Sequence, residues 1–242
     1  MNFGVSYFGN RILKHIKTDM RELKENGFSF VLHTYSEYDL KFREKTLKDI
    51  VTISHDEGLE VWVNPWGVGN VFGGEPFSNF ASQNIFTSCQ VLDDGNPTAI
   101  ACPNSPEFNN YMDLWLKAVN EAKVDTILWD EPHFHEQEFL SSVVGRWGCR
   151  CKYCQSQYQK IFDVEMPMQE TDEVKLFKQK SLHKFISRLA NKAKGLGIKN
   201  ALYLTANLEI ENIVSSWENY FKIKSIDIIS TGPYWLWAKK DV

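Results

Sequence analysis

The chain has 242 residues, a net charge of −4, 43% hydrophobic side chains and 24% charged side chains. This is the composition of a globular domain, and it excludes collagen, coiled coils and intrinsically disordered chains. There is no basic tract for a nucleic acid and no uncharged apolar run for a membrane span, so we expect neither partner. The length suits a single α/β domain, since an eight-stranded barrel takes about 250 residues.

Short β-type runs alternate with longer amphipathic stretches along almost the whole chain. Strand–helix–strand units of this kind require a parallel sheet, which predicts an α/β fold. The runs predicted as strands, in chain order, are Asn2–Gly9, Phe28–Ser36, Leu59–Gly67, Val124–Pro132, Lys199–Asn207 and Ile226–Trp235.

Two of the stretches between these runs have the spacing of an amphipathic helix, with apolar residues three or four positions apart. In the first, these residues are Ile12, Ile16, Met20 and Leu23. In the second they are Leu182, Phe185, Ile186, Leu189 and Ala193, ending near Gly195. Glycines with the position of a left-handed C-cap, between a helix and the next strand, are Gly27, Gly58 and Gly197.

The ends of the predicted strands favour a barrel over an open sheet. No strand is followed by the Gly-rich phosphate turn of dinucleotide-binding sheets. The carboxyl ends instead carry polar and aromatic residues, as the active-site face of a barrel does. These residues are Tyr7, His33, Tyr35, Asn64, Trp66, Asp130, Glu131, Asn207, Tyr234 and Trp235. We therefore predict a single TIM (β/α)8-type barrel domain over residues 1–242.

That barrel is incomplete, because the pattern supplies six strands rather than eight. Two further strand–helix units would take roughly 60 to 80 more residues. An open edge of a parallel sheet invites aggregation. We expect a second copy of the chain, as a homo-oligomer, or a missing C-terminal segment to cover it.

Four cysteines are predicted to form a structural zinc site. Cys149, Cys151 and Cys154 have the spacing C-x-C-x2-C, and Cys102 lies in the preceding long loop. The loops after the third and fourth strands of a barrel meet on one rim, and four thiolates in a tetrahedron suit Zn²⁺. The alternatives are a disulfide within this set or unrelated cysteines, and Cys89 has no spacing partner. The absence of a signal sequence predicts a reducing, cytoplasmic location.

The segment ILWDEPHFHE places two acids at the end of the fourth predicted strand. Side chains alternate along a strand, so Asp130 and Glu131 are expected on opposite sides. If Ile127 and Trp129 face inward, then Glu131 does too; it would be the catalytic candidate and Asp130 would orient a neighbour. A second carboxylate and nearby rings would raise the pKa of Glu131, as a general acid requires. The alternative is that both acids cap a helix or hold a basic residue.

The remaining strand-end residues suit a carbohydrate ligand, although each alone is also explained by packing. Aromatic faces for the C–H side of a sugar come from Trp66, Tyr234 and Trp235, and Tyr7 and Tyr35 are also predicted to bind the substrate. Hydrogen bonds to hydroxyl groups come from His33, Asn64 and Asn207. His133 is predicted at the rim as a further hydrogen-bonding group, and His135 as a rim or surface residue.

The acid at the end of strand four, the C-x-C-x2-C motif and the earlier cysteine in CPNSPEF together resemble family 42 glycoside hydrolases, which are β-galactosidases with a barrel catalytic domain. The resemblance implies zinc on Cys102, Cys149, Cys151 and Cys154, and Glu131 as the acid/base. Asp130 stands where that family has Asn, and the strand that would carry the nucleophile is not found. More broadly, the chain is similar to uncharacterised barrel proteins related to glycoside hydrolases.

Two functions follow from this reading. The first is a glycoside hydrolase with Glu131 as proton donor and a second carboxylate from Asp130 or from a missing segment. The second is a carbohydrate-binding barrel without catalysis. A third reading, with Asp130 as nucleophile, lacks an acid after strand six, although Glu209 and Glu211 follow strand five. A zinc hydrolase is disfavoured because four cysteines leave no open coordination position.

Overall fold

The computed structural model describes residues 2–135, 145–204 and 217–232. Its main sheet has six strands in the order β1-β2-β3-β6-β7-β8, and every neighbouring pair is parallel. The strands are β1 (Gly4–Tyr7), β2 (Phe30–Thr34), β3 (Glu60–Asn64), β6 (Thr126–Asp130), β7 (Lys199–Tyr203) and β8 (Ile228–Ser230). Spatial order follows chain order, which makes the sheet a curled, incomplete TIM barrel and confirms the predicted fold class.

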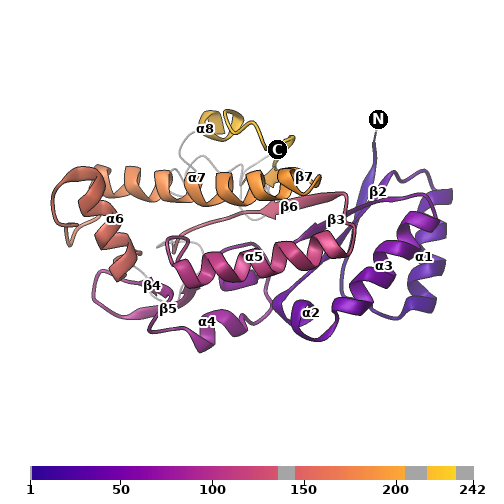
Figure 1. The fold of residues 1–242 in the computed structure, drawn as a ribbon, viewed down its shortest axis with the longest axis horizontal. Helices are drawn as coiled ribbons and strands as arrows, with labels where there is room; N and C mark the ends of the chain where they lie inside the picture. Colours follow the sequence, from indigo (N-terminus) through magenta and orange to yellow (C-terminus); the bar gives the residue numbers. More distant parts are fainter. Residues whose placement is uncertain (1, 136–144, 205–216, 233–242) are drawn as a thin grey trace, which may run out of the picture.

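The crossover connections are helical. The longer helices are α1 (Leu13–Glu25), α3 (Glu44–Asp56), α5 (Pro106–Glu121), α6 (Lys152–Phe162) and α7 (Asp172–Gly195). The shorter ones are α2 (Glu37–Phe42), the 3-10 turn η1 (Val68–Asn70), α4 (Asn79–Gln83) and α8 (Trp217–Phe221). Helices α5 and α7 lie side by side (Figure 1). Within the described ranges, no helix is both long enough and apolar enough to cross a bilayer.

Both predicted amphipathic helices are confirmed. Ile16 and Met20 are the buried residues of α1, and the apolar positions predicted for the later helix are buried along α7. The three glycines predicted as left-handed caps have φ angles of +85° at Gly27, +81° at Gly58 and +82° at Gly197. These helices form where the pattern indicates because burial of one apolar stripe against the sheet stabilises each of them.

The main core lies between the sheet and the helices. Trp129 of β6 packs there against Trp115 of α5, with ring centroids 6.0 Å apart, and its Nε1 donates to Asn200 Oδ1 at 2.8 Å. A smaller apolar cluster on the inner side of the sheet contains Leu32, Leu128 and Ala201. In β6, therefore, Trp129 faces the helices, and Leu128 and Asp130 face the barrel interior. This is the reverse of the parity on which the preference for Glu131 was based.

A long excursion between β3 and β6 carries an antiparallel hairpin that the strand pattern missed. Its strands are β4 (Cys89–Val91) and β5 (Pro97–Ala101), and an isolated bridge joins Leu92 to Gly148. The turn signal was present in the sequence as Asp-Asp-Gly-Asn over residues 93–96, but the flanking strands are too short to show alternation. The hairpin and α6 gather at one end of the molecule, on the left in Figure 1.

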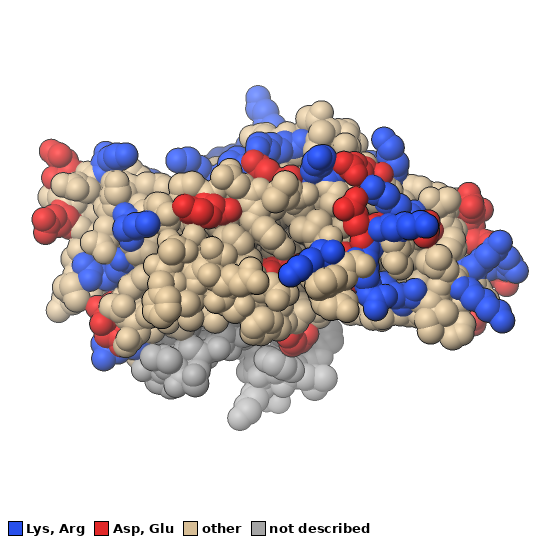
Figure 2. Space-filling model, turned by 60° about the horizontal axis from the view of Figure 1, so that its bottom comes forward, with Lys and Arg blue, Asp and Glu red and all other residues tan. Residues whose placement is uncertain are grey.

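Charges are mixed on the face drawn in Figure 2, where Lys and Arg lie beside Asp and Glu. The expectation of no nucleic-acid partner stays a prediction, as does the expectation that a second copy or a further segment covers the sheet edge.

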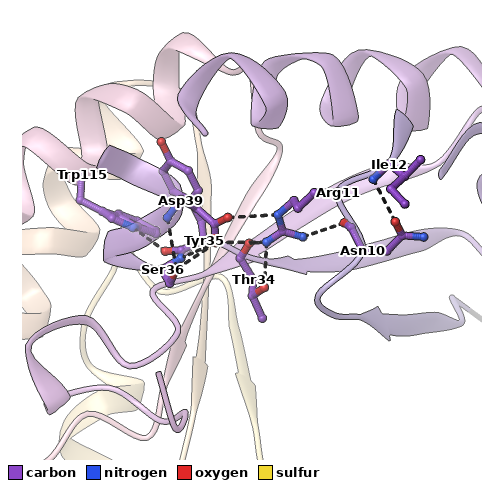
Figure 3. A network of polar contacts seen from close by, with 8 residues as sticks. All are labelled: Asn10, Arg11, Ile12, Thr34, Tyr35, Ser36, Asp39 and Trp115. Atoms are coloured by element: carbon purple, nitrogen blue, oxygen red, sulfur yellow. Dashed lines mark hydrogen bonds and ion pairs between the residues drawn. The ribbon is translucent and has the colours of Figure 1, made fainter. Parts of the chain in front are cut away.

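A buried ion pair ties the loop after β1 to helix α2 (Figure 3). Arg11 Nε and Nη2 donate to the two oxygens of Asp39, both at 3.1 Å, and Nη2 also donates to Thr34 O at 2.9 Å. Asp39 also closes a capping box with Ser36 at the start of α2. The side chains of Arg11 and Asp39 are 13% and 10% exposed, so the pair is poorly hydrated and depends on these bonds.

Substituting Arg11→Lys is expected to lower the free energy of unfolding by about 1–2 kcal/mol, because an ammonium group cannot reproduce the two-pronged contact. Urea unfolding followed by circular dichroism measures this. Arg21→Lys is the matched control: the Arg21–Glu57 pair has an Arg side chain that is 55% exposed, and we expect a change below about 0.5 kcal/mol there. Equal effects of the two variants would contradict the importance of the buried pair.

Candidate functional site

Asp130 is the inward-facing acid at the carboxyl end of β6. Its Oδ2 accepts a hydrogen bond from Asn64 Nδ2 at 3.0 Å, so the ends of β3 and β6 are joined as the sequence predicted. Burial and the neighbouring Glu131 carboxylate raise the pKa of Asp130 to about 6, partly offset by the Asn64 hydrogen bond. Asn64 is fully buried, and its Oδ1 has no partner among the described residues. A carboxyl group that titrates close to neutral pH therefore lies beside a buried acceptor.

The loop after β3 lies directly against this acid. The amide of Gly73 donates to the backbone oxygen of Asp130 at 2.9 Å, and a Cβ atom on Gly73 would lie 3.2 Å from Oδ2. A side chain there would crowd the carboxylate. Gly73 is a site residue that the sequence reading missed, although the Gly-Gly pair at 73–74 signals a close backbone approach.

Glu131 has a backbone conformation that interrupts strand alternation. Its φ angle is +41°, which is uncommon for a residue other than glycine. Its amide donates to Tyr203 O at 3.1 Å, and its carbonyl oxygen lies 2.7 Å from His133 Nδ1, which must donate to it. The regular side-chain alternation ends here, so an inward Asp130 does not force Glu131 outward. The Glu131 carboxylate raises the pKa of Asp130, and the two acids therefore interact as a pair.

Trp66 also belongs to this group. It follows β3, and its ring packs against Phe8, which follows β1, with centroids 4.9 Å apart. The sequence reading named Trp66 but chose Tyr7 rather than Phe8 from β1. Tyr7 contacts Asp19 of α1 whereas Phe8 contacts Trp66, and only the structure shows which side of the strand faces the helices.

The structure places three predicted ligand-binding residues away from the inward side of the sheet. The hydroxyl of Tyr7 donates to Asp19 of α1, and the ring of His33 lies 3.4 Å from Ser54 Oγ of α3. Burial lowers the pKa of His33 to about 4, so this imidazole is neutral. Tyr35 is fully buried against Trp115. Tyr7, His33 and Tyr35 therefore belong to the packing between strands and helices, and their contact with a substrate stays a prediction.

His133 and His135 lie in the loop after β6 and are buried. The imidazole of His133 donates a hydrogen bond to the Glu131 carbonyl oxygen, and the backbone amide of His133 donates to Val71 O at 2.9 Å. The amide of His135 donates to Gln90 Oε1 of the hairpin at 2.8 Å. Burial lowers the pKa of each imidazole. The structure thus makes His133 a support for the Glu131 backbone, and His135 is not the surface residue that the sequence suggested.

Three predicted sugar contacts, Asn207, Tyr234 and Trp235, lie outside the described residues, as do Glu209 and Glu211. Their proposed roles stay predictions. Tyr203 lies on the inner face at the end of β7, a position that the sequence did not indicate. Its side chain packs against the inner apolar cluster, and its carbonyl oxygen accepts a hydrogen bond from the Glu131 amide.

Asp130→Asn is expected to stabilise the protein at pH 7.5 by about 1–2 kcal/mol and to have almost no effect near pH 4. The pKa of Asp130 is about 6 in the folded chain against 3.8 as its ordinary value, so the folded state binds the proton more tightly. The cost of ionising Asp130 is thus absent below pH 4, grows as pH rises and is complete above pH 6. Chemical denaturation of both proteins at the two pH values measures this, and a stability difference independent of pH would contradict it.

Four cysteines form a second cluster, and all of them are buried. The Sγ atoms of Cys102, Cys149, Cys151 and Cys154 all lie within 4.8 Å of one another. Cys102 Sγ is 3.5 Å from Cys154 Sγ, 3.5 Å from Cys151 Sγ and 3.8 Å from Cys149 Sγ. The predicted meeting of the two loops is confirmed, no disulfide joins these four cysteines, and the cluster can hold a metal ion.

Donors surround these sulfur atoms as they would surround thiolates. Asn104 Nδ2 donates to Cys154 Sγ at 3.3 Å, and the amide of Cys151 donates to Cys149 Sγ at 3.4 Å. Burial raises the pKa of the Cys102 thiol. The pKa of Cys151 is lowered by hydrogen bonds from the thiols of Cys102, Cys149 and Cys154, of which the bond from Cys102 has the largest effect. Four thiolates this close repel one another, so holding all four would need a positive charge at the centre.

No protein-family model matches the chain, and no curated protein matches it. Solved structures do resemble it. A GH20 exo-β-N-acetylglucosaminidase from Vibrio harveyi superposes with a TM-score of 0.56 at 8% identity, over 84% of this chain and 35% of that one. A β-N-acetylhexosaminidase gives 0.54 at 12% identity, over 86% and 48%.

A GH36 α-galactosidase from Geobacillus stearothermophilus gives a TM-score of 0.52 at 11% identity, over 84% of this chain and 28% of that chain. The chain thus spans less than half the length of each of these three enzymes. At such identities the likeness establishes the fold alone: the chain has a TIM-barrel architecture, and the particular resemblance to family 42 stays a prediction.

Proposed function

We propose that the chain is a glycoside hydrolase-like barrel that acts on a carbohydrate, with Glu131 as general acid/base. The observation that carries this proposal is the Asp130–Glu131 pair at the carboxyl end of β6, with Asp130 raised in pKa to about 6 and bonded to Asn64. The carboxyl ends of the strands are where barrel enzymes build their active sites. The structural neighbours act on carbohydrates, as their names state, which supports the same substrate class here.

The chemistry needs a proton donor for the leaving oxygen. In this proposal Glu131 is the general acid/base that meets this need, and Asp130, oriented by Asn64, is the second carboxyl group. Glycosidases of the common type work with two carboxyl groups in this way.

We propose zinc as the metal of the cysteine cluster. Zn–S bonds of about 2.3 Å in a tetrahedron place sulfur atoms about 3.8 Å apart. The three distances from Cys102 Sγ to the other sulfurs lie between 3.5 and 3.8 Å, which fits without a large rearrangement. Four thiolates close the coordination sphere, so the ion is structural. Retaining four thiolates also favours a reducing compartment, in accord with a cytoplasmic location.

The metal site supports the acidic pair through one short loop. A Cβ atom on Gly148, next to Cys149, would lie 3.4 Å from the Cβ of His135. His135 is two residues from His133, whose Nδ1 holds the Glu131 carbonyl. The cysteine cluster therefore anchors the segment that fixes the Glu131 backbone, which gives a structural metal a reason to lie near this strand end.

The alternative function is a non-catalytic carbohydrate-binding barrel with the same zinc site. It is favoured by the carboxyl ends of the described strands, among which only that of β6 carries carboxylates. Under this alternative the acidic pair and Trp66 bind a sugar without breaking a bond.

A panel of p-nitrophenyl glycosides, covering gluco-, galacto- and N-acetylglucosaminides in both anomeric forms, distinguishes the two. Release of nitrophenol by the wild-type chain above a buffer control supports the hydrolase. Saturable binding of a sugar from the panel by calorimetry, without release, supports the binding barrel. If the protein neither releases nitrophenol nor binds any sugar of the panel, both proposed functions are overturned.

A further inference from the structure

The rim of the half-barrel carries an aromatic pair that comes from two different strand ends. Phe8 follows β1 and Trp66 follows β3, and their rings lie 4.9 Å apart at an interplanar angle of 44°. Phe8 is 45% exposed although it is apolar. We propose that Phe8 and Trp66 form a stacking subsite for a second sugar unit of an oligosaccharide whose first unit contacts Asp130. This inference rests on the carbohydrate function proposed above and names a subsite of it.

The pair is linked to the acid by continuous contacts. The amide of Gly73 donates a hydrogen bond to the backbone oxygen of Asp130, and the carbonyl oxygen of Gly73 accepts one from the Gly67 amide at 2.9 Å. On the next residue, a Cβ atom on Gly74 would lie 2.6 Å from Cδ2 of the Trp66 ring. The space that a side chain on either glycine would take is filled by Asp130 and by Trp66, so the loop packs closely against the carboxylate and the indole ring alike.

Another exposed ring pair shows what distinguishes this one. Tyr38 and Phe42 of α2 also lie 4.9 Å apart, at 48°. Those two residues are one helical turn apart, and cations already cover them: Lys41 Nζ lies 5.2 Å from the Phe42 centroid, and Arg43 lies 5.8 Å from that of Tyr38. That arrangement is explained by the helix itself. The Phe8–Trp66 pair has no such local cause, because tertiary folding brings its members together.

The chemistry of the pair suits a sugar ring. The C–H groups on one face of a pyranose are apolar, and aromatic rings at binding sites bury such faces while nearby polar groups fix the orientation. Asp130, oriented by the buried Asn64, supplies a polar group of this kind on the inward side. Polar recognition is thus expected at the strand ends and stacking at the rim, so a disaccharide should bind better than a monosaccharide.

The experiment measures dissociation constants by isothermal titration calorimetry for three matched series: glucose and cellobiose, galactose and β-1,4-galactobiose, and N-acetylglucosamine and chitobiose. We expect wild-type protein to bind the disaccharide of one series at least about 10-fold more tightly than its monosaccharide, which corresponds to about 1.4 kcal/mol. Phe8→Ala should reduce that ratio to below about 3-fold and leave the monosaccharide affinity unchanged. Phe8→Tyr keeps a ring and should restore the ratio, and Phe42→Ala should leave it at the wild-type value.

The outcomes separate this inference from the function on which it rests. If wild-type protein binds none of the six sugars, the carbohydrate function fails and the subsite fails with it. If wild-type protein binds a disaccharide preferentially and Phe8→Ala retains the full ratio, only the subsite is overturned. An equal loss for monosaccharide and disaccharide in Phe8→Ala also overturns it, since the residue would then act on the whole site. Thermal unfolding of each variant verifies that the comparison is made between folded proteins.

Discussion

Replacement of Cys154 by serine is expected to abolish stoichiometric metal binding and to lower the melting temperature by about 10 °C or more. Cys154 Sγ lies 3.5 Å from Cys102 Sγ, and α6 carries Cys154 into contact with the loop after β5. Removing one of four thiolates opens the coordination sphere and frees this loop from α6. Metal binding at a site of this kind is folding free energy, and a loss of about 4 kcal/mol shifts the melting temperature of a domain of this size by roughly 8–16 °C.

Elemental analysis of freshly purified protein together with differential scanning calorimetry measures both effects. Cys89→Ser is the matched control, because Cys89 is buried in the neighbouring hairpin but donates to Ala81 O at 3.3 Å and lies outside the four-sulfur cluster. We expect that control to retain one equivalent of zinc. Wild-type protein with less than half an equivalent of any metal, or a Cys154→Ser protein with a full equivalent, would contradict the metal site.

Glu131→Gln is expected to lower kcat/KM on the preferred nitrophenyl glycoside by about 10²–10⁴-fold, the range that general acid–base catalysis contributes. Glutamine keeps the size of the side chain and the backbone bonds to Tyr203 and His133, but it cannot donate a proton as an acid does. Loss of Glu131 also removes the charge that helps raise the pKa of Asp130, so the Asp130 pKa should move down toward its ordinary value of 3.8. The pH dependence of the residual activity should therefore shift to lower pH.

Steady-state kinetics between pH 4 and pH 8 provides the measurement. Glu75→Gln is the control: Glu75 is an exposed carboxylate in the loop after β3, between Gly74 and Pro76, and its removal should change kcat/KM by less than about twofold. Unchanged turnover in Glu131→Gln would remove Glu131 from the mechanism. A loss in Glu131→Gln that affects KM alone would make Glu131 a substrate-binding residue rather than the general acid/base.

Local patterns in the sequence were sufficient for much of the fold. Short apolar runs, amphipathic spacing and the glycines at 27, 58 and 197 predicted six parallel strands and their helical connections, because these signals act over a few residues. Strand ends were predicted less well: the sixth predicted strand began at Ile226, whereas β8 is limited to Ile228–Ser230 among the described residues. The proximity of Cys102 to the C-x-C-x2-C motif was also predictable, since neighbouring strands place their following loops on one rim.

The sequence by itself thus determined the α/β alternation, the order of the strands and the meeting of the four cysteines. Only the tertiary structure decided which side of each strand faces inward. A shift of one residue moves every side chain of a strand to the other face, and the sequence does not distinguish the two faces because both are buried in a barrel. That choice placed Asp130 inside and assigned Tyr7 and His33 to the helix side. It also brought Phe8 to Trp66, a contact between residues far apart in the chain that no local pattern specifies.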